Sequence, residues 1–301
     1  VSRIEQSVDT VSDIALENLD FQKFQSDSAY VDSYTESLRD DFITFAEHTD
    51  GAICAYIRYN PDFTSPTSGI FLTRPDTQSE FTSVTPTDFS IYDKDDVAHV
   101  GWYYIPVENK APIWMDPYLN ENVNIYMISY VVPLYVDGVS VGIIGMDIDF
   151  GQITDYTDAI KAFDTGYSFI TKNDGTIQHH AEIPAGTDLA TYDNGALAKV
   201  GEFMSDDANQ STVISYKWNG KENYMTFSKL DIGMDLAITV PTVEVTAHAK
   251  KVAIQTIGAM CIGIVVSVVL GIVLGNSIAG PLVKITSLVM QKAALHFQKT
   301  T

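Results

Sequence analysis

The chain of 301 residues has only two cysteines, and one of them, Cys261, lies in a long apolar segment far from Cys54. We expect no disulfide between them, which excludes a small fold stapled by disulfides. Basic residues are also scarce, with 18 Lys and Arg against 39 Asp and Glu. Because proteins bind phosphate backbones through clustered Lys and Arg, this composition argues against a nucleic-acid partner.

Catalytic and metal-binding motifs are absent from the sequence. It contains no Walker loop, GxSxG elbow or HExxH pair, and His179 and His180 are adjacent rather than one helical turn apart. The acidic residues are scattered and form no catalytic grouping. We therefore predict no enzyme activity, no cofactor and no metal site, and a surface hydrolase is the least favoured function.

Acidic residues are missing from the end of the chain: all 39 precede residue 250, whereas residues 250–301 contain five Lys and no acid. Within this region, 23 consecutive uncharged residues run from Val252 to Leu274. At about 1.5 Å per residue they reach roughly 35 Å, enough to cross a hydrocarbon core of about 30 Å. Helices of soluble domains are seldom apolar on every face, so we predict a transmembrane helix over residues 252–275.

The charges that flank this helix predict its orientation. Lys284, Lys292 and Lys299 follow the span without any acid, and short lysine-rich segments favour the cytoplasm. The acidic body would then lie outside the cell. We expect a protein of the cell membrane, with residues 1–249 extracellular and residues 276–301 cytoplasmic.

The first 48 residues predict one long amphipathic helix, with a signalling role by its position. Apolar residues recur at spacings of three and four, namely Ile4, Val8, Val11, Ala15 and Leu19. The pattern begins abruptly and without a capping residue. This suggests that a first membrane anchor has been removed from the chain.

Two groups of short β-strands follow, and together with the helices they predict an α+β fold. The first module, residues 49–163, has candidate strands at 52–59, 69–73, 125–135 and 139–150, with the hairpin turn Asp137-Gly138 between the last two. The second module, residues 164–245, has candidate strands at 167–172, 177–179, 212–218, 222–228 and 234–240. The last strand leads into the membrane helix with little room for a flexible linker, so the body could push on that helix.

Several sequence segments carry a family resemblance over nearly the whole chain up to residue 245. They are Trp114–Tyr118 (WMDPY), Met127–Tyr135 (MISYVVPLY), Gly142–Ile148 (GIIGMDI), Gly166–Ile170 (GYSFI) and Asn173-Asp174-Gly175. In this order they resemble the double Cache sensor domain of bacterial methyl-accepting chemotaxis proteins and of related kinases and cyclases. The resemblance implies two tandem PAS-like modules, with the ligand in the module farther from the membrane.

The segment after the membrane helix, Asn276–Ile285 (NSIAGPLVKI), resembles the start of a HAMP linker. Leu282 and Ile285, followed by Leu288 or Val289, have the spacing of a coiled coil. An ordinary juxtamembrane helix is the alternative. With the HAMP reading we expect a homodimer through the N-terminal helix, the membrane helix and HAMP, which signals to cytoplasmic proteins through an output domain absent from this sequence.

Asp147 is the sharpest candidate for ligand contact. It lies on an apolar strand, where Val141, Ile143 and Gly145 share its face, and a buried carboxylate is costly unless it is paired. A bound ammonium group would be a natural partner. The family resemblance implies the same contact, because the corresponding Asp of amino-acid-binding members contacts the ligand's amino group. Asp149 is next on that face and could equally cap a helix.

The other candidates are aromatic and polar residues of the first module. The predicted ligand-binding residues are Tyr92, Trp102, Tyr103, Trp114, Asp116, Tyr118, Asn120 and Asp147. Core packing is the alternative for the aromatic residues. Two positions depart from the amino-acid-binding members: Val100 stands where they carry an Arg for the ligand's carboxylate, and Asn120 where many carry an acid. An amine or another small polar molecule is therefore as plausible as an α-amino acid.

We predict that the chain is the sensing region of a transmembrane chemoreceptor for a small amine or amino-acid-like molecule. The sensor region of a histidine kinase or diguanylate cyclase would share every feature of this sequence. A third alternative is a surface protein that binds solute without signalling, which would have no coiled coil after the membrane.

Overall fold

The computed structural model describes residues 2–121 and 123–298. The chain forms two compact units, Val1–Val240 and Pro241–Thr301. The first unit contains helices and two antiparallel sheets, which confirms the predicted α+β fold. The second unit is the single helix α8 (Thr242–Gln298).

The N-terminal segment is helical but is divided into α1 (Ser2–Glu17), α2 (Phe21–Ser26) and α3 (Ser28–Glu47). The prediction of one continuous helix is therefore wrong. Asp20 and Asp27 cause the breaks: each has an extended backbone and caps the next helix with its carboxylate, which accepts from backbone N–H groups of the first turn. The predicted apolar face of α1 is nevertheless buried.

The first sheet has seven strands in the order β3-β2-β1-β7-β6-β4, and β5 also pairs with β6. Their bounds are β1 Ala52–Tyr59, β2 Gly69–Thr73, β3 Thr82–Ser83, β4 Ile113–Trp114, β5 Tyr118–Asn120, β6 Ile125–Val136 and β7 Val139–Asp149. The β6–β7 turn has the predicted hairpin geometry, since Asp137 and Gly138 both have positive φ (51° and 80°).

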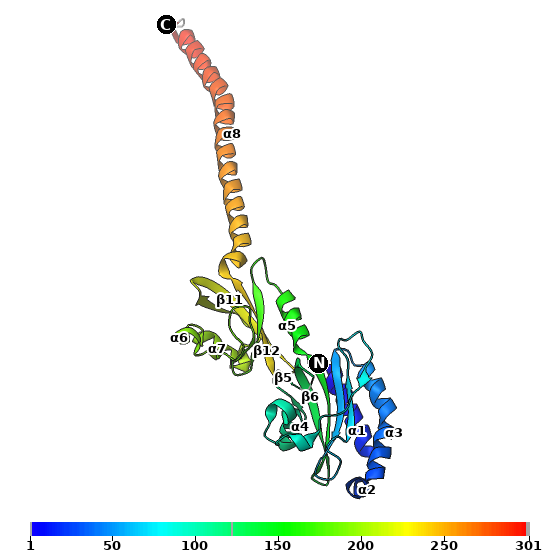
Figure 1. The fold of residues 1–301 in the computed structure, drawn as a ribbon. Coiled ribbons are helices and arrows are strands. Elements are labelled where there is room, and N and C mark those ends of the chain that lie inside the picture. The colour runs from blue at the N-terminus through cyan, green and yellow to red at the C-terminus, as the bar shows by residue number, and fades with distance from the viewer. Residues whose placement is uncertain (1, 122, 299–301) are drawn as a thin grey trace. The chain divides into compact units, whose positions relative to one another are not determined.

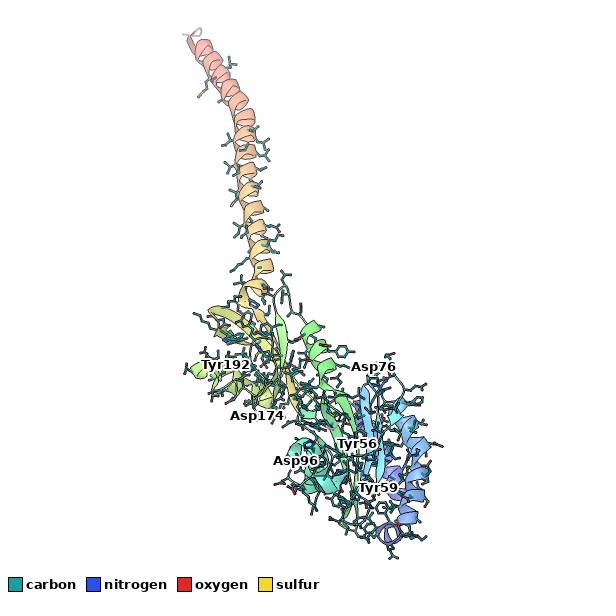
Figure 2. All side chains as sticks on the ribbon, viewed as in Figure 1. Tyr56, Tyr59, Asp76, Asp96, Asp174 and Tyr192 are labelled. Carbon is teal, nitrogen blue, oxygen red and sulfur yellow. The ribbon has the colours of Figure 1, made fainter. Side chains whose placement is uncertain are left out.

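Helices cover both faces of this sheet. α1 and α3 pack on one face, and α4 (Val97–Asn109) packs on the other against β5, β6 and β7 (Figure 1). Strand β1 shows the alternation: Tyr59 faces the α1–α3 layer, whereas Tyr56 faces the layer of α4 and the short 3₁₀ helix Phe89–Ile91 (both tyrosines are labelled in Figure 2). We call the face that carries Tyr56 the α4 face.

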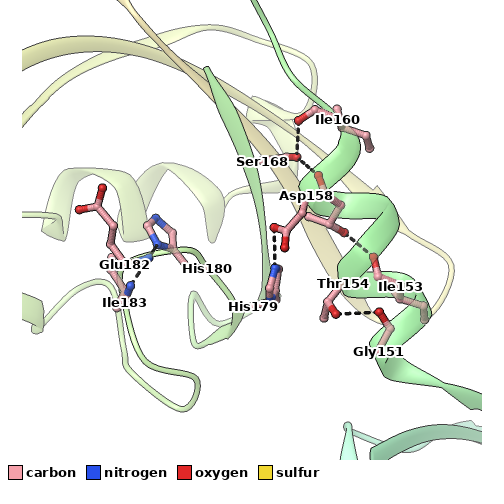
Figure 3. A network of polar contacts seen from close by, with 11 residues as sticks. Gly151, Ile153, Thr154, Asp158, Ile160, Ser168, His179, His180, Glu182 and Ile183 are labelled. Carbon is pink, nitrogen blue, oxygen red and sulfur yellow. Dashed lines mark hydrogen bonds and ion pairs between the residues drawn. The ribbon is translucent and has the colours of Figure 1, made fainter. Parts of the chain in front are cut away.

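The second sheet has five strands in the order β10-β11-β12-β8-β9. The elements of this half are α5 (Phe150–Ala159), β8 (Tyr167–Lys172), β9 (Ile177–His179), α6 (Tyr192–Gly195), α7 (Ala198–Met204), a 3₁₀ helix (Asp207–Asn209), β10 (Ile214–Trp218), β11 (Lys221–Leu230) and β12 (Met234–Pro241). Polar contacts fix α5 against the sheet: His179 Nε2 lies 2.8 Å from Asp158 Oδ1, and the Ser168 hydroxyl donates to the carbonyl of Ile160 at 2.9 Å (Figure 3).

Helix α8 follows β12 without an intervening linker residue. Its segment Thr242–Leu274 is long and apolar enough to cross a membrane, with a mean hydropathy of 2.8, and none of its most apolar stretch is buried. Large apolar side chains are exposed throughout, for example Ile254 at 70%. The backbone of the HAMP-like segment is helical, but the side chains of 276–279 and 281–285 lie outside the described residues, so that resemblance stays a prediction.

Candidate functional site

Asp147 lies at the centre of the first sheet and is fully buried. Its cross-strand partners are Cys54 on β1 and Ser129 on β6. The hydroxyl of Tyr56 donates to Asp147 Oδ1 at 3.0 Å. Oδ2 has no hydrogen-bond partner among the described residues. One carboxylate oxygen is thus bonded and the other is not, and the whole group is shielded from bulk solvent.

Burial raises the pKa of Asp147 to about 7, although the nearby hydroxyls of Ser129 and Tyr56 and the thiol of Cys54 act in the opposite direction. Removal from water penalises the ionised form, and no described cation offsets that penalty. A ligand ammonium group beside Oδ2 would supply both the missing donor and the missing positive charge.

An aromatic wall stands over this carboxyl group. The Tyr56 ring is stacked on Phe71, with centroids 5.5 Å apart, and meets the Trp102 ring edge-on at 5.1 Å. Gly145 makes room for it: a Cβ atom at that position would lie 2.6 Å from the Tyr56 ring and hydroxyl. The missing side chain of Gly145 therefore lets the Tyr56 hydroxyl reach Asp147.

One residue of β7 lies on the other face of the sheet from the face that the sequence predicts. Ile143 packs on the same face as Asp147, as expected, but Val141 packs with the α1–α3 layer. The β6–β7 register shifts between Leu134 and Tyr135, and Gly142 has a φ of 154°. A bulge of this kind changes the phase of the alternation, so the prediction for Val141 is wrong.

A cavity of about 280 Å³ adjoins this region. It is lined by Val97, Trp102, Ile105, Ile113, Trp114, Met115, Asp116, Pro117 and Tyr118. Four of the eight predicted residues are therefore brought together around it. Tyr118 connects the cavity to the acid, since its hydroxyl lies 3.1 Å from the hydroxyl of Ser129, the cross-strand partner of Asp147.

Two of these four residues also have partners elsewhere. The indole of Trp114 donates to Glu5 of α1 at 2.7 Å and packs on Tyr130, so its ring is engaged with the α1–α3 layer. Asp116 forms an ion pair with Lys172 of β8 at 2.9 Å. Asp116 therefore links the cavity wall to the second sheet.

The remaining predicted residues have diverse surroundings. Tyr92 is stacked on His99, whose ring lies between the carboxylates of Asp96 and Glu121. Tyr103 is buried, with its ring 4.7 Å from that of Phe89. Asn120 is also buried, at 2% exposure.

Asp149 takes its alternative role, which is to cap a helix. Its Oδ1 accepts the backbone N–H of Gly151 at 2.8 Å, at the start of α5. The carboxylate is thus bonded to the backbone of its own chain. Two acids on one strand therefore have different partners: Asp147 is incompletely bonded and Asp149 is a cap.

Arg58 on β1 is a functional candidate that sequence reasoning missed. It is fully buried on the α4 face, with its guanidinium 4.2 Å from the centre of the Phe89 ring and 5.9 Å from that of Trp102. It donates to the carbonyls of Pro66, Ser68 and Thr87, while Nη1 has no partner in the described structure. Burial lowers its pKa to about 10, so it stays charged at neutral pH.

The strand pattern could have revealed Arg58, because it follows Cys54 and Tyr56 at a period of two and so shares their face. Val100, the position expected to carry a basic residue in an amino-acid site, is buried and uncharged. The α4 face nevertheless carries one buried cation. For metals, no group of three or more His, Cys, Asp or Glu among the described residues could hold an ion.

The first of the two sheet modules thus combines a buried, incompletely bonded acid with an aromatic wall and a small cavity. The chain belongs to the Cache domain family, whose pattern matches residues 1–249. Domains of this family are extracellular sensors that bind ligands.

Solved structures share the fold at low sequence identity. The extracellular domain of mmHK1S-Z3, a histidine kinase by its name, is 17% identical with a TM-score of 0.55, and the match covers 82% of this chain and 96% of that one. The ligand-binding domain of the amino acid chemoreceptor PctB of Pseudomonas aeruginosa PAO1, in complex with L-Arg, is 15% identical with a TM-score of 0.51, covering 80% and 87%. A comparison with curated proteins found no match.

Proposed function

We propose that this chain is the sensing region of a transmembrane chemoreceptor that binds a small molecule with an ammonium group at Asp147. The observation that carries the proposal is the fully buried carboxyl group whose Oδ2 has no partner in the described structure. An ammonium group provides donors and a positive charge in one place. The adjoining cavity of about 280 Å³ suits an amine or amino-acid-like molecule.

The ligand's carboxylate, if it has one, needs a different partner from the one in amino-acid-binding relatives. Val100 cannot supply it, and Arg58 gives three carbonyls most of its donors. This favours a ligand recognised mainly through its ammonium end. The ligand-binding domain of PctB, which shares this fold, was solved in complex with L-Arg, an amino acid with a second cationic group.

Signalling would use the connection from the cavity wall to the membrane helix. Asp116 of the wall is paired with Lys172, and Lys172 lies opposite Met234, the first residue of β12. β12 ends at Pro241 and α8 begins at Thr242. We propose that the body is extracellular, that α8 spans the membrane, and that a homodimer with a HAMP linker passes the change to cytoplasmic proteins.

The test is a thermal-shift screen of the full chain in lipid nanodiscs against amines, amino acids and organic acids. Specific binding to the folded state raises the melting temperature. We expect at least one amine or amino acid to give a shift whose apparent affinity Asp147→Asn weakens tenfold or more. Asp149→Asn is the matched control, because it removes a neighbouring acid and Asn is also a good helix cap. If Asp147→Asn left the apparent affinity of every amine and amino acid unchanged, the proposed site would be overturned.

A histidine kinase output is the second candidate, since the extracellular domain of mmHK1S-Z3 shares this fold. The full-length receptor separates the two outputs. Ligand-dependent methylation of cytoplasmic glutamates would support the chemoreceptor. Ligand-dependent autophosphorylation on histidine would support the kinase.

A further inference from the structure

A second incompletely bonded acid lies in the other sheet. Asp235 on β12 and Thr171 on β8 are cross-strand partners, and both are fully buried. Neither oxygen of the Asp235 carboxylate has a hydrogen-bond partner in the described part of the chain, and the same holds for the Thr171 hydroxyl. Three polar atoms therefore lie unbonded at neighbouring positions of one sheet, which is rare in folded proteins.

The surroundings of this pair are apolar and aromatic. Ala237 follows Asp235 on the same face of β12, and it packs in a cluster with Phe169 of β8 and Phe227 of β11. The positive charge of Lys229 acts on Asp235, but the Lys229 ammonium group is held by Asp207 at 2.5 Å. The charge of Lys229 is thus already balanced, and Asp235 has no direct partner.

Burial raises the pKa of Asp235 to about 6; Lys229 lowers it and Asp207 raises it. The carboxyl group is therefore mostly ionised at neutral pH. A buried carboxylate without donors is unfavourable, so an external donor would stabilise this state strongly.

We propose that Asp235 and Thr171 form a second binding site, for a primary ammonium group, in the module next to the membrane helix. The three acceptor atoms match the three N–H donors of such a group. The aromatic side chains of the same cluster favour cations over anions. The excess of acids in residues 1–249 also raises the local concentration of cations.

The position of this site on β12 gives it a functional consequence. Asp235 lies in the strand that ends at Pro241, immediately before α8. An occupant of the site would therefore act on that strand directly. The site is independent of Asp147, which lies in the other sheet.

The experiment uses the full chain with the substitution Asp147→Asn, in nanodiscs, so that the carboxyl group of Asp147 cannot contribute to binding. Methylammonium is the probe, and tetramethylammonium at equal concentration is its control, because it has the same charge but no N–H donor. We expect a saturable rise in melting temperature with methylammonium alone. Adding Asp235→Asn or Thr171→Val should weaken the apparent affinity tenfold or more.

The two variants keep the test decisive. Asp235→Asn removes a buried charge, and Thr171→Val keeps the shape of the side chain, so each should fold. Equal shifts from the two salts would overturn the proposal, as would no methylammonium shift in the Asp147→Asn protein. A shift unchanged by both added substitutions would place the ammonium group elsewhere and would also overturn it.

Discussion

At the scale of single residues, Asp147 is a group whose charge depends on what lies beside it. Without a cation, burial raises its pKa to about 7, so near neutral pH the carboxyl group is divided between its neutral and ionised forms. A bound ammonium group would favour the ionised form and lower the pKa. Ligand binding at the proposed site would therefore be coupled to proton release from Asp147.

We expect the affinity for an ammonium ligand to rise with pH. An alkylammonium group stays protonated up to about pH 10, so only the carboxyl group titrates. Below pH 7 the ligand must displace a proton, and the dissociation constant should fall about tenfold per pH unit until it levels off above pH 7. Calorimetry at pH 6, 7 and 8 in buffers of different ionisation enthalpy measures both effects. A constant affinity would contradict the role of Asp147.

Gly145→Ala should destabilise the body and weaken ligand binding together. Its Cβ would lie 2.6 Å from the Tyr56 ring, so the ring must move away from Asp147. Overpacking of this kind costs about 1–3 kcal/mol in unfolding free energy. Urea denaturation checks the stability. Tyr56→Phe, which removes only the hydroxyl, should weaken binding with a smaller loss of stability.

At the scale of elements, the ion pair between Asp116 and Lys172 connects the cavity wall to β8. Asp116 is 66% exposed in its side chain, so the pair contributes at most about 1 kcal/mol to stability. Its importance would therefore come from its position and not from its energy. Lys172 lies opposite the start of β12, which leads into α8.

We predict that breaking this pair uncouples ligand binding from α8. In the Lys172→Asp variant, which breaks the pair without changing a residue of the cavity wall, the ligand should bind with nearly unchanged affinity. The ligand-induced change in hydrogen exchange of residues 242–250, measured by mass spectrometry, should fall by half or more. The charge swap Asp116→Lys with Lys172→Asp should restore it, and failure of the swap would show that the pair does not carry the signal.

At the scale of the whole molecule, the proposed membrane span implies that the two cysteines are shielded from water-soluble reagents in different ways. Cys54 is buried in the first sheet, whereas Cys261 is exposed on the apolar segment of α8. If lipid covers that segment, a water-soluble maleimide cannot reach Cys261. The apolar surface of α8 in the described structure has no protein cover, which supports this arrangement.

We therefore expect neither cysteine to react with a polymer-linked maleimide in nanodiscs, and both to react after denaturation in detergent. A Thr246→Cys variant, near the start of α8, should react before denaturation, because polar and charged residues surround that position in sequence. The measurement is a gel shift. Rapid labelling of Cys261 in intact nanodiscs would contradict the membrane span.

Much of the fold could be predicted from local sequence. β1, β2, β8 and β9 have the predicted bounds, and the β6–β7 turn has its predicted geometry, because alternation and turn residues act over a few positions. The breaks in the N-terminal segment were missed because Asp20 and Asp27 sit inside an otherwise periodic pattern. A helix cap depends on a single side chain, and the spacing of apolar residues carries no information about it.

The sequence by itself determined most of the strands, the apolar span after Lys251 and the position of Asp147 on an apolar strand, since each follows from residues close together in the chain. The short strands β3, β4 and β5 are not predicted by it. Only the tertiary structure decided how Asp147 is bonded. Its neighbours Tyr56 and Ser129 come from other strands, and the phase shift at Val141 depends on register with β6. The orphan oxygens of Asp147 and Asp235 likewise depend on contacts across a sheet, which no local pattern specifies.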